Sequence, residues 1–220
     1  MADFTRNGYG QVEPNQLSAQ KTGQIYASLP LDEEVNVLQN GEFMYYDYAN
    51  GSVNSGKEAD AEAGTVKTAG EPMLVFNEIK LYEPFWRTSY KDFAMIRVGD
   101  NYVTSKLATD KYGENSDQNV ADYTIEHQDY GYRMKGIAPR LFKTNVGDIY
   151  TTNMVKTGAG IEYEVGNLLV PVVNNTTKTL QLEKFTATVS DPEPKGMAWS
   201  VVKVYQMPDG QPGLKLQRVQ

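Results

Sequence analysis

The sequence predicts a mainly β protein, built as an antiparallel β sandwich or barrel with an extended N-terminal arm. Strand-sized runs recur from Met73 to the C-terminus, and Gly, Pro, Asn and Asp residues separate them. No stretch keeps a helical period for more than two turns, and the window 116–127 is the best candidate for a short helix. Many short strands between frequent turn signals are typical of sandwiches and barrels. The expected strands cover residues 73–76, 92–98, 161–165, 168–173, 180–189, 199–205 and 214–219.

Residues 1–30 have a different composition from the rest of the chain. They are rich in Gly, Gln, Asn and small polar residues, and a segment so poor in apolar side chains does not fold by itself. A disordered tail is one interpretation, and an arm that orders against a neighbouring subunit is the other. The spaced apolar anchors favour the arm; they are Phe4, Tyr9, Val12, Leu17, Ile25 and Leu29. We therefore expect an arm over residues 1–30 and a β-rich domain over residues 31–220.

The first element expected in the domain is a β-hairpin over residues 33–48. Valines alternate with polar residues on its first strand, and the dipeptide Asn40-Gly41 suits a type I′ turn. In residues 49–72, Gly, Ser, Ala and charged residues replace the aromatic residues of the preceding segment, which predicts a mobile loop. Alternation along the strands places these residues in the core: Val75, Phe93, Met95, Leu141, Tyr163, Val165, Leu169, Val201 and Val204.

The phrase V-G-D-x-Y-x-T occurs at residues 98–104 and again at 146–152, and a weaker copy opens the run at 164–171. Its glycine can take the positive φ of a tight turn, and its Asp side chain can accept hydrogen bonds from the N–H groups just after it. We therefore predict a turn that starts a strand, with Gly99, Asp100, Gly147 and Asp148 as its scaffold. Use of the two aspartates as paired carboxylates or metal ligands is the alternative, and turn preference disfavours it. The copies are also compatible with an internal duplication.

Composition and charge exclude several classes of function. The chain has 21 basic and 28 acidic residues, and its Lys and Arg residues are scattered without a basic run, so nucleic acid is not expected as a partner. No apolar run is long enough for a membrane-spanning helix. The absence of cysteine excludes disulfides, thiolate zinc sites and cysteine nucleophiles. The first residues lack an apolar signal region, which predicts synthesis in a cytoplasm.

The residues that could carry chemistry do not form a recognisable catalytic motif. His127 is flanked by acidic residues, but no nucleophile elbow, phosphate-binding loop or zinc-protease motif accompanies it. The acidic loop at 110–119 offers oxygen ligands but departs from the EF-hand order, so a hydrated loop is expected there. We expect a protein that is not an enzyme and holds no cofactor or metal.

Fifteen tyrosines and two tryptophans form a large aromatic load, clustered at 45–48, 81–90 and 130–132. Such residues fill β cores, and they are also favoured at subunit interfaces and on sugar-binding platforms. An interface is preferred because no compact aromatic pair matched to a sugar ring is visible. The expected interface residues are Tyr9, Leu17, Ile25, Tyr82, Phe85, Trp86 and Tyr90.

Two long runs carry a resemblance to a known class of proteins. They are E-I-K-L-Y-E-P-F-W-R-T-S-Y-K-D-F-A-M at 78–95 and A-P-R-L-F-K-T-N-V-G-D-I-Y-T-T-N-M-V at 138–155. Together with the N-terminal arm, the chain resembles structural proteins of tailed bacteriophages, of the capsid auxiliary (decoration or cement) type. The resemblance implies a non-enzymatic protein that binds a capsid shell and stabilises it. The implied partners are the major capsid protein, other virion proteins and further copies of the chain, in a virion assembled in the host cytoplasm.

Two alternatives stay open at this point. A tail-tube or tail-completion protein would build a ring through a curved sheet, with residues 33–48 and the loop 49–72 as a long hairpin. A carbohydrate-binding module would use Trp86 and Trp199 to stack on sugars and the acidic loop to hold calcium.

Overall fold

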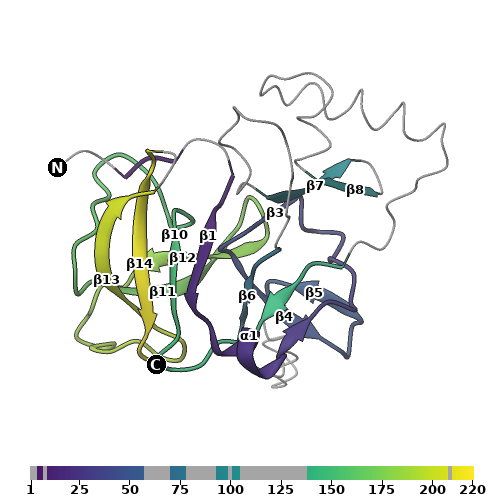
Figure 1. The fold of residues 1–220 in the computed structure, drawn as a ribbon, viewed down its shortest axis with the longest axis horizontal. Helices are drawn as coiled ribbons and strands as arrows, with labels where there is room; N and C mark the ends of the chain where they lie inside the picture. The colour runs from purple at the N-terminus through teal and green to yellow at the C-terminus, as the bar shows by residue number, and fades with distance from the viewer. Residues whose placement is uncertain are drawn as a thin grey trace.

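A computed structural model describes residues 4–6, 9–56, 70–77, 93–98, 101–104, 138–207 and 210–220. These residues form an antiparallel sheet that curls into a half-barrel and, beside it, a second, three-stranded sheet (Figure 1). The prediction of a mainly β protein of the sandwich or barrel class is therefore confirmed.

The main sheet contains eleven of the described strands. Along the sheet they follow the order β1 (Val12–Gln16), β10 (Ile149–Thr152), β14 (Pro212–Arg218), β13 (Trp199–Gln206), β11 (Leu168–Asn174), β12 (Thr179–Lys184), β4 (Phe43–Asp47), β6 (Met73–Val75), β9 (Leu141–Phe142) and β2 (Ile25–Tyr26), and β5 (Ser52–Asn54) pairs with β4. The smaller sheet follows the order β3 (Val37–Gln39), β7 (Ala94–Val98) and β8 (Asn101–Thr104). All the ladders between these strands are antiparallel.

The two outermost strands of the main sheet, β1 and β2, are consecutive in the chain. Only residues 17–24 separate them, and these include the short helix α1 (Ser18–Thr22). Because a helical residue advances the chain by only about 1.5 Å, this connection brings the two ends of the sheet close together. The N-terminal segment therefore spans the open side of the half-barrel.

Two hydrophobic cores lie on opposite faces of β4, β6 and β9. Successive residues of these strands point to opposite faces, so Phe43 enters the first core and Met44 the second. The first core fills the half-barrel and contains the buried Tyr150 and Trp199, whose rings meet edge to face at 4.8 Å between centroids. The second core lies between the outer face of this wall and the three-stranded sheet. These three strands are consequently apolar on both faces.

The structure builds much of the predicted arm into the domain of its own chain. Strand β1 pairs with β10, β2 pairs with β9, and Phe4, Val12 and Leu17 are buried in the first core. The spaced apolar anchors thus find the interior of the half-barrel. Residues 12–26 are a closing element of the sheet in the single chain.

Two local predictions are wrong. Residues 33–48 do not form a hairpin, because β3 pairs with β7 whereas β4 pairs with β5, β6 and β12. Residues 161–165 form no strand, and their last residue, Val165, is exposed together with Val204, although both were expected in the core. Residues 161–165 form a loop in which Tyr163 is buried in the first core and Ile161 packs against it. Val204 lies in strand β13 but is 41% exposed. The other expected core residues are buried: Val75, Phe93, Met95, Leu141, Tyr163, Leu169 and Val201.

Candidate functional site

The copies of the phrase at 146–152 and 164–171 begin in a type of turn that occurs three times in the described residues. We name the copies turn A (39–42), turn B (145–148) and turn C (164–167). In each, the N–H of the fourth residue donates to the carbonyl oxygen of the first, at 3.3, 3.0 and 3.1 Å respectively. The side chain of the fourth residue accepts a hydrogen bond from the N–H of the first, at 2.8, 2.9 and 3.0 Å. The third residue is a glycine with a φ of 92°, 95° and 89°, which favours glycine at this position.

Each turn also binds a neighbouring strand in the same way. The glycine N–H donates to the carbonyl oxygen of Val75, Arg218 or Val201, at 2.9, 2.8 and 2.8 Å for turns A, B and C. The N–H of the same residue returns a bond to the carbonyl oxygen of the fourth turn residue, at 2.8, 2.9 and 2.9 Å. A strand follows each turn: β4, β10 and β11. In these described turns the sequence starts a strand, and the side chain of the fourth residue accepts from the N–H three residues before it, whereas bonds to the N–H groups after it were predicted.

Turns B and C are related by a local two-fold axis. The axis passes through the pair Ser200 and Gln217 at the centre of strands β10, β14, β13 and β11. It superposes the pair Leu168–Ser200 on Ile149–Gln217, and Leu169–Trp199 on Tyr150–Leu216. Each of the two related strands contains a bulge. In β13 the register shifts between Val201 and Lys203. After β14, the Ala198 carbonyl oxygen accepts from the N–H groups of both Val219 and Gln220. The weak repeat in the sequence therefore corresponds to a structural repeat.

Exposed valines occupy equivalent positions around this axis. Val146 in turn B and Val165 in turn C are each 67% exposed, and the bulge residues Val202 and Val219 are 42% and 44% exposed. Tyr150, Leu169 and their neighbours point into the first core, so Ile149 and Leu168 point outward, where both are half-buried. We call these six residues the aliphatic face. An outward sheet face is usually polar, whereas this one carries six aliphatic side chains around the polar pair Ser200 and Gln217.

The fourth residue of turn A, Glu42, is a fully buried acid. Its carboxylate accepts hydrogen bonds from the Gln39 N–H and the Thr179 hydroxyl, both at 2.8 Å. Burial raises the pKa of Glu42 to about 7, although these hydrogen bonds and the charge of Arg6 act in the opposite direction. This carboxyl group links turn A to β12.

The buried Asp47 and Asp148 are likewise used by the fold. Burial works to raise the pKa of Asp47, but hydrogen bonds from Asn50, Asn54 and the Ala49 N–H hold it below its usual value. Asp148 accepts bonds from the N–H and the hydroxyl of Ser18 at 3.0 and 2.8 Å. It thereby joins turn B to the helix that spans the half-barrel.

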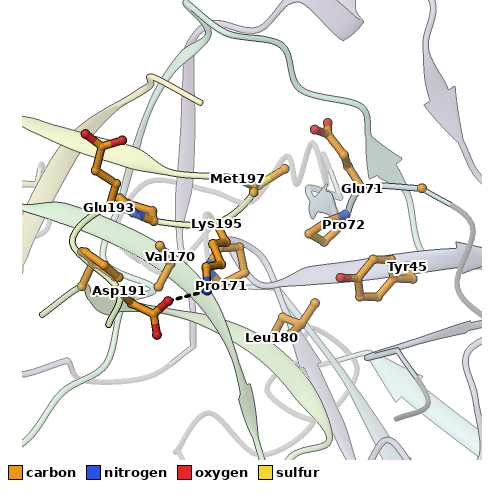
Figure 2. A pocket seen from close by; sticks show the side chains of 14 residues that line it. Tyr45, Glu71, Pro72, Val170, Pro171, Leu180, Asp191, Glu193, Lys195 and Met197 are labelled. Carbon is orange, nitrogen blue, oxygen red and sulfur yellow. Dashed lines mark ion pairs between the residues drawn. The ribbon is translucent and has the colours of Figure 1, made fainter. Parts of the chain in front are cut away.

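A pocket of about 470 Å³ lies between β11, β12, β4 and the loop 191–197 (Figure 2). Its apolar side chains include Tyr45, Pro72, Pro171, Leu180 and Met197. Glu71 stands at one end, and Asp191 and Glu193 stand at the other, where Lys195 forms an ion pair with Asp191. Sequence reasoning missed this pocket, because its walls come from distant segments. The charged, proline-containing run at 191–196 is the one local signal that pointed to it.

The predicted interface residues differ in their exposure, and several of them lie outside the described residues. Leu17 is buried inside its own chain and is therefore not available to a neighbour, whereas Tyr9 and Ile25 are half-buried. Gly147 and Asp148 form turn B, as described above. The remaining predicted site residues lie outside the described residues: Tyr82, Phe85, Trp86, Tyr90, Gly99 and Asp100. His127, the loop 110–119 and the helix candidate at 116–127 lie outside them as well, while the predicted loop 49–72 contains β5.

Trp199, which the carbohydrate-binding alternative places on a sugar platform, is fully buried between Phe43 and Tyr150. Among the described residues, no three His, Cys, Asp or Glu side chains are grouped as metal ligands would be. In the same part of the chain, none of the helices has the length and apolar character needed to cross a bilayer. No protein-family model, curated protein or solved structure matches the chain.

Proposed function

We propose that this chain is a non-enzymatic structural protein that works by assembling with other proteins. The aliphatic face carries this proposal, because it places exposed valines in equivalent positions on a rigid, repeated four-stranded unit. A regular apolar surface of this kind suits contacts that symmetry repeats many times. Following the sequence resemblance, we propose the role of a capsid auxiliary protein of a tailed bacteriophage, bound to the major capsid protein.

The use of the buried acids also supports an architectural role. Glu42, Asp47 and Asp148 each accept two or more hydrogen bonds from turn, strand or helix residues of their own chain. Their chemistry stabilises the ends of strands. The tail-tube alternative placed a long hairpin over residues 33–48 and the loop 49–72, and β3 and β4 do not pair with each other within it.

Sedimentation of the purified chain, alone and mixed with empty phage shells, tests this proposal. We expect concentration-dependent association or binding to shells, and the double variant Val165→Lys/Val202→Lys should weaken it at least tenfold. Val189→Lys is the matched control, because Val189 is fully exposed but lies outside the aliphatic face. The proposal would be contradicted if the chain stayed monomeric and did not bind the shells. It would also be contradicted if the double variant and the control weakened association equally. Electron microscopy of decorated shells would then locate the bound protein on capsid or tail.

A further inference from the structure

Strand β11 has a free edge along most of its length. It pairs with β12 from Leu169 to Asn174, but β13 covers its other side only at Leu168 and Leu169. From Pro171 to Asn174, none of the described residues adds a strand on that side. Val172 and Val173 are 37% and 41% exposed there. Natural edges are usually protected by charge or proline, and β11 has proline at only one of these positions.

The hydrogen-bond pattern identifies which backbone groups face outward. The Phe185 N–H donates to the Leu168 carbonyl oxygen, and the Lys178 N–H donates to that of Asn174, so even-numbered residues of β11 bond toward β12. In an antiparallel ladder, the alternate residues then direct their polar groups to the opposite side. Pro171, which has no N–H, occupies one of these outward positions. The outward groups are therefore the Val173 N–H and the carbonyl oxygens of Pro171 and Val173.

The pocket described above lies against this edge. Val170 and Pro171 of β11 form one of its walls, and Leu180 and Met197 add further apolar surface. A volume of about 470 Å³ admits one or two long side chains of a bound segment.

The charges at the mouth of the pocket favour a cation. Three carboxylates, of Glu71, Asp191 and Glu193, stand against the ammonium group of Lys195 and the guanidinium group of Arg218, which gives a formal charge of −1. Arg218 pairs with Glu71 and Lys195 with Asp191, so Glu193 is the carboxylate best placed to meet a ligand. A long aliphatic stem that ends in a positive charge matches both the apolar walls and the acidic rim.

We propose that the free edge of β11 and this pocket together bind an extended segment of a partner protein that contains lysine or arginine. The segment adds a strand beside β11, bonds the outward groups of Pro171 and Val173, and inserts a basic side chain into the pocket. This inference deepens the proposed function, on which it rests, by naming the chemistry of one partner contact.

Selection from a random seven-residue peptide library on the full-length protein tests the proposal. We expect enriched peptides to contain lysine or arginine among β-branched residues. Val173→Pro should weaken their binding roughly tenfold because it removes one outward N–H donor. Val173→Thr is the matched control, since it keeps that N–H. Glu193→Lys provides a second test that leaves the backbone intact, and it should weaken binding by a similar factor.

Three results would overturn the proposal. They are enrichment of acidic peptides, peptides that bind equally well to Val173→Pro and Glu193→Lys, and a selection that enriches nothing. A circular dichroism spectrum and melting curve like those of the wild type must accompany each variant; if Val173→Pro does not fold, Glu193→Lys alone decides. Because assembly through the aliphatic face is measured by sedimentation, failure of the peptide selection leaves the proposed function to stand or fall by its own experiment.

Discussion

Turns B and C have the same backbone but different surroundings. In both, a glycine with positive φ and an acceptor side chain at the fourth position start a strand. Asp148 of turn B also binds Ser18, whereas Asn167 of turn C bonds only the exposed Glu164 N–H within its own turn. The comparison teaches that the fourth side chain of turn C acts within its own turn, whereas that of turn B also fastens the N-terminal segment across the half-barrel. Turn A has the most enclosed surroundings of the three, because its fourth side chain, Glu42, is fully buried.

Replacing the glycine of turn A should have the largest effect. In Gly41→Ala the new Cβ would lie 2.6 Å from the Met154 Cβ and 2.7 Å from the Thr152 hydroxyl oxygen, at a φ of +92°. Backbone strain and a clash with packed atoms then add, and we expect a loss of about 4 kcal/mol in the free energy of unfolding. Urea denaturation followed by circular dichroism measures it. A loss below about 1 kcal/mol would show that turn A is not rigidly packed.

The acid of turn A should make stability depend on pH. The folded protein holds the Glu42 proton up to about pH 7, whereas the unfolded chain holds it only up to about 4.5. Between these values the folded state binds more protons, so the contribution of Glu42 to stability is complete below pH 4.5 and is lost as the pH rises to 7. The loss is about 3 kcal/mol at most.

Glu42→Gln isolates this contribution. Glutamine can accept from the Gln39 N–H and donate to the Thr179 hydroxyl, so the variant should fold and lose the pH dependence between 4.5 and 7. Chemical denaturation at several pH values measures the slope for both proteins. If the free energy of unfolding changed with pH equally in the variant and the wild type, Glu42 would not be the source of the pH dependence.

The third prediction separates turns B and C directly. Asp148→Ala removes three hydrogen bonds, two of them to Ser18, and should cost about 2 kcal/mol more than Asn167→Ala, which removes one. Hydrogen exchange should show a second difference, because only Asp148→Ala releases α1. In that variant the amides of β1 and β2 should exchange faster. Equal costs for the two variants would mean that the bonds to Ser18 add no stability.

The sequence predicted the class of the fold because alternation and turn residues are local signals. Strands β6, β7, β11, β13 and β14 were found in this way, within two residues at each end. The V-G-D phrase was recognised as a turn for the same reason, but turn A was mistaken for a hairpin. Its Asn40-Gly41 dipeptide is compatible with both turn types, and the choice depends on Val75, which lies 34 residues beyond Gly41 in the sequence.

Features that depend on distant segments could not be read in this way. The pairing of β1 with β10 joins residues such as Val12 and Thr152, and composition alone made the N-terminal segment look like an arm. The pocket is likewise assembled from five segments of the chain. Val165 was expected in the core because it alternates with acidic residues, yet it occupies the exposed second position of turn C.

The smallest effect provides the sharpest test of the local two-fold axis. Gly147 and Gly166 have nearly equal positive φ values, and a Cβ at either would meet no atom within 4 Å. Gly147→Ala and Gly166→Ala should therefore cost the same, about 1 kcal/mol each, from backbone strain alone. Their double variant should cost the sum, because the two turns lie on opposite sides of the β13–β14 pair and share no partner. If one substitution costs much more than the other, the surroundings of the turn determine the loss of stability and its backbone conformation does not. Turns B and C would then be equivalent in geometry but not in energy.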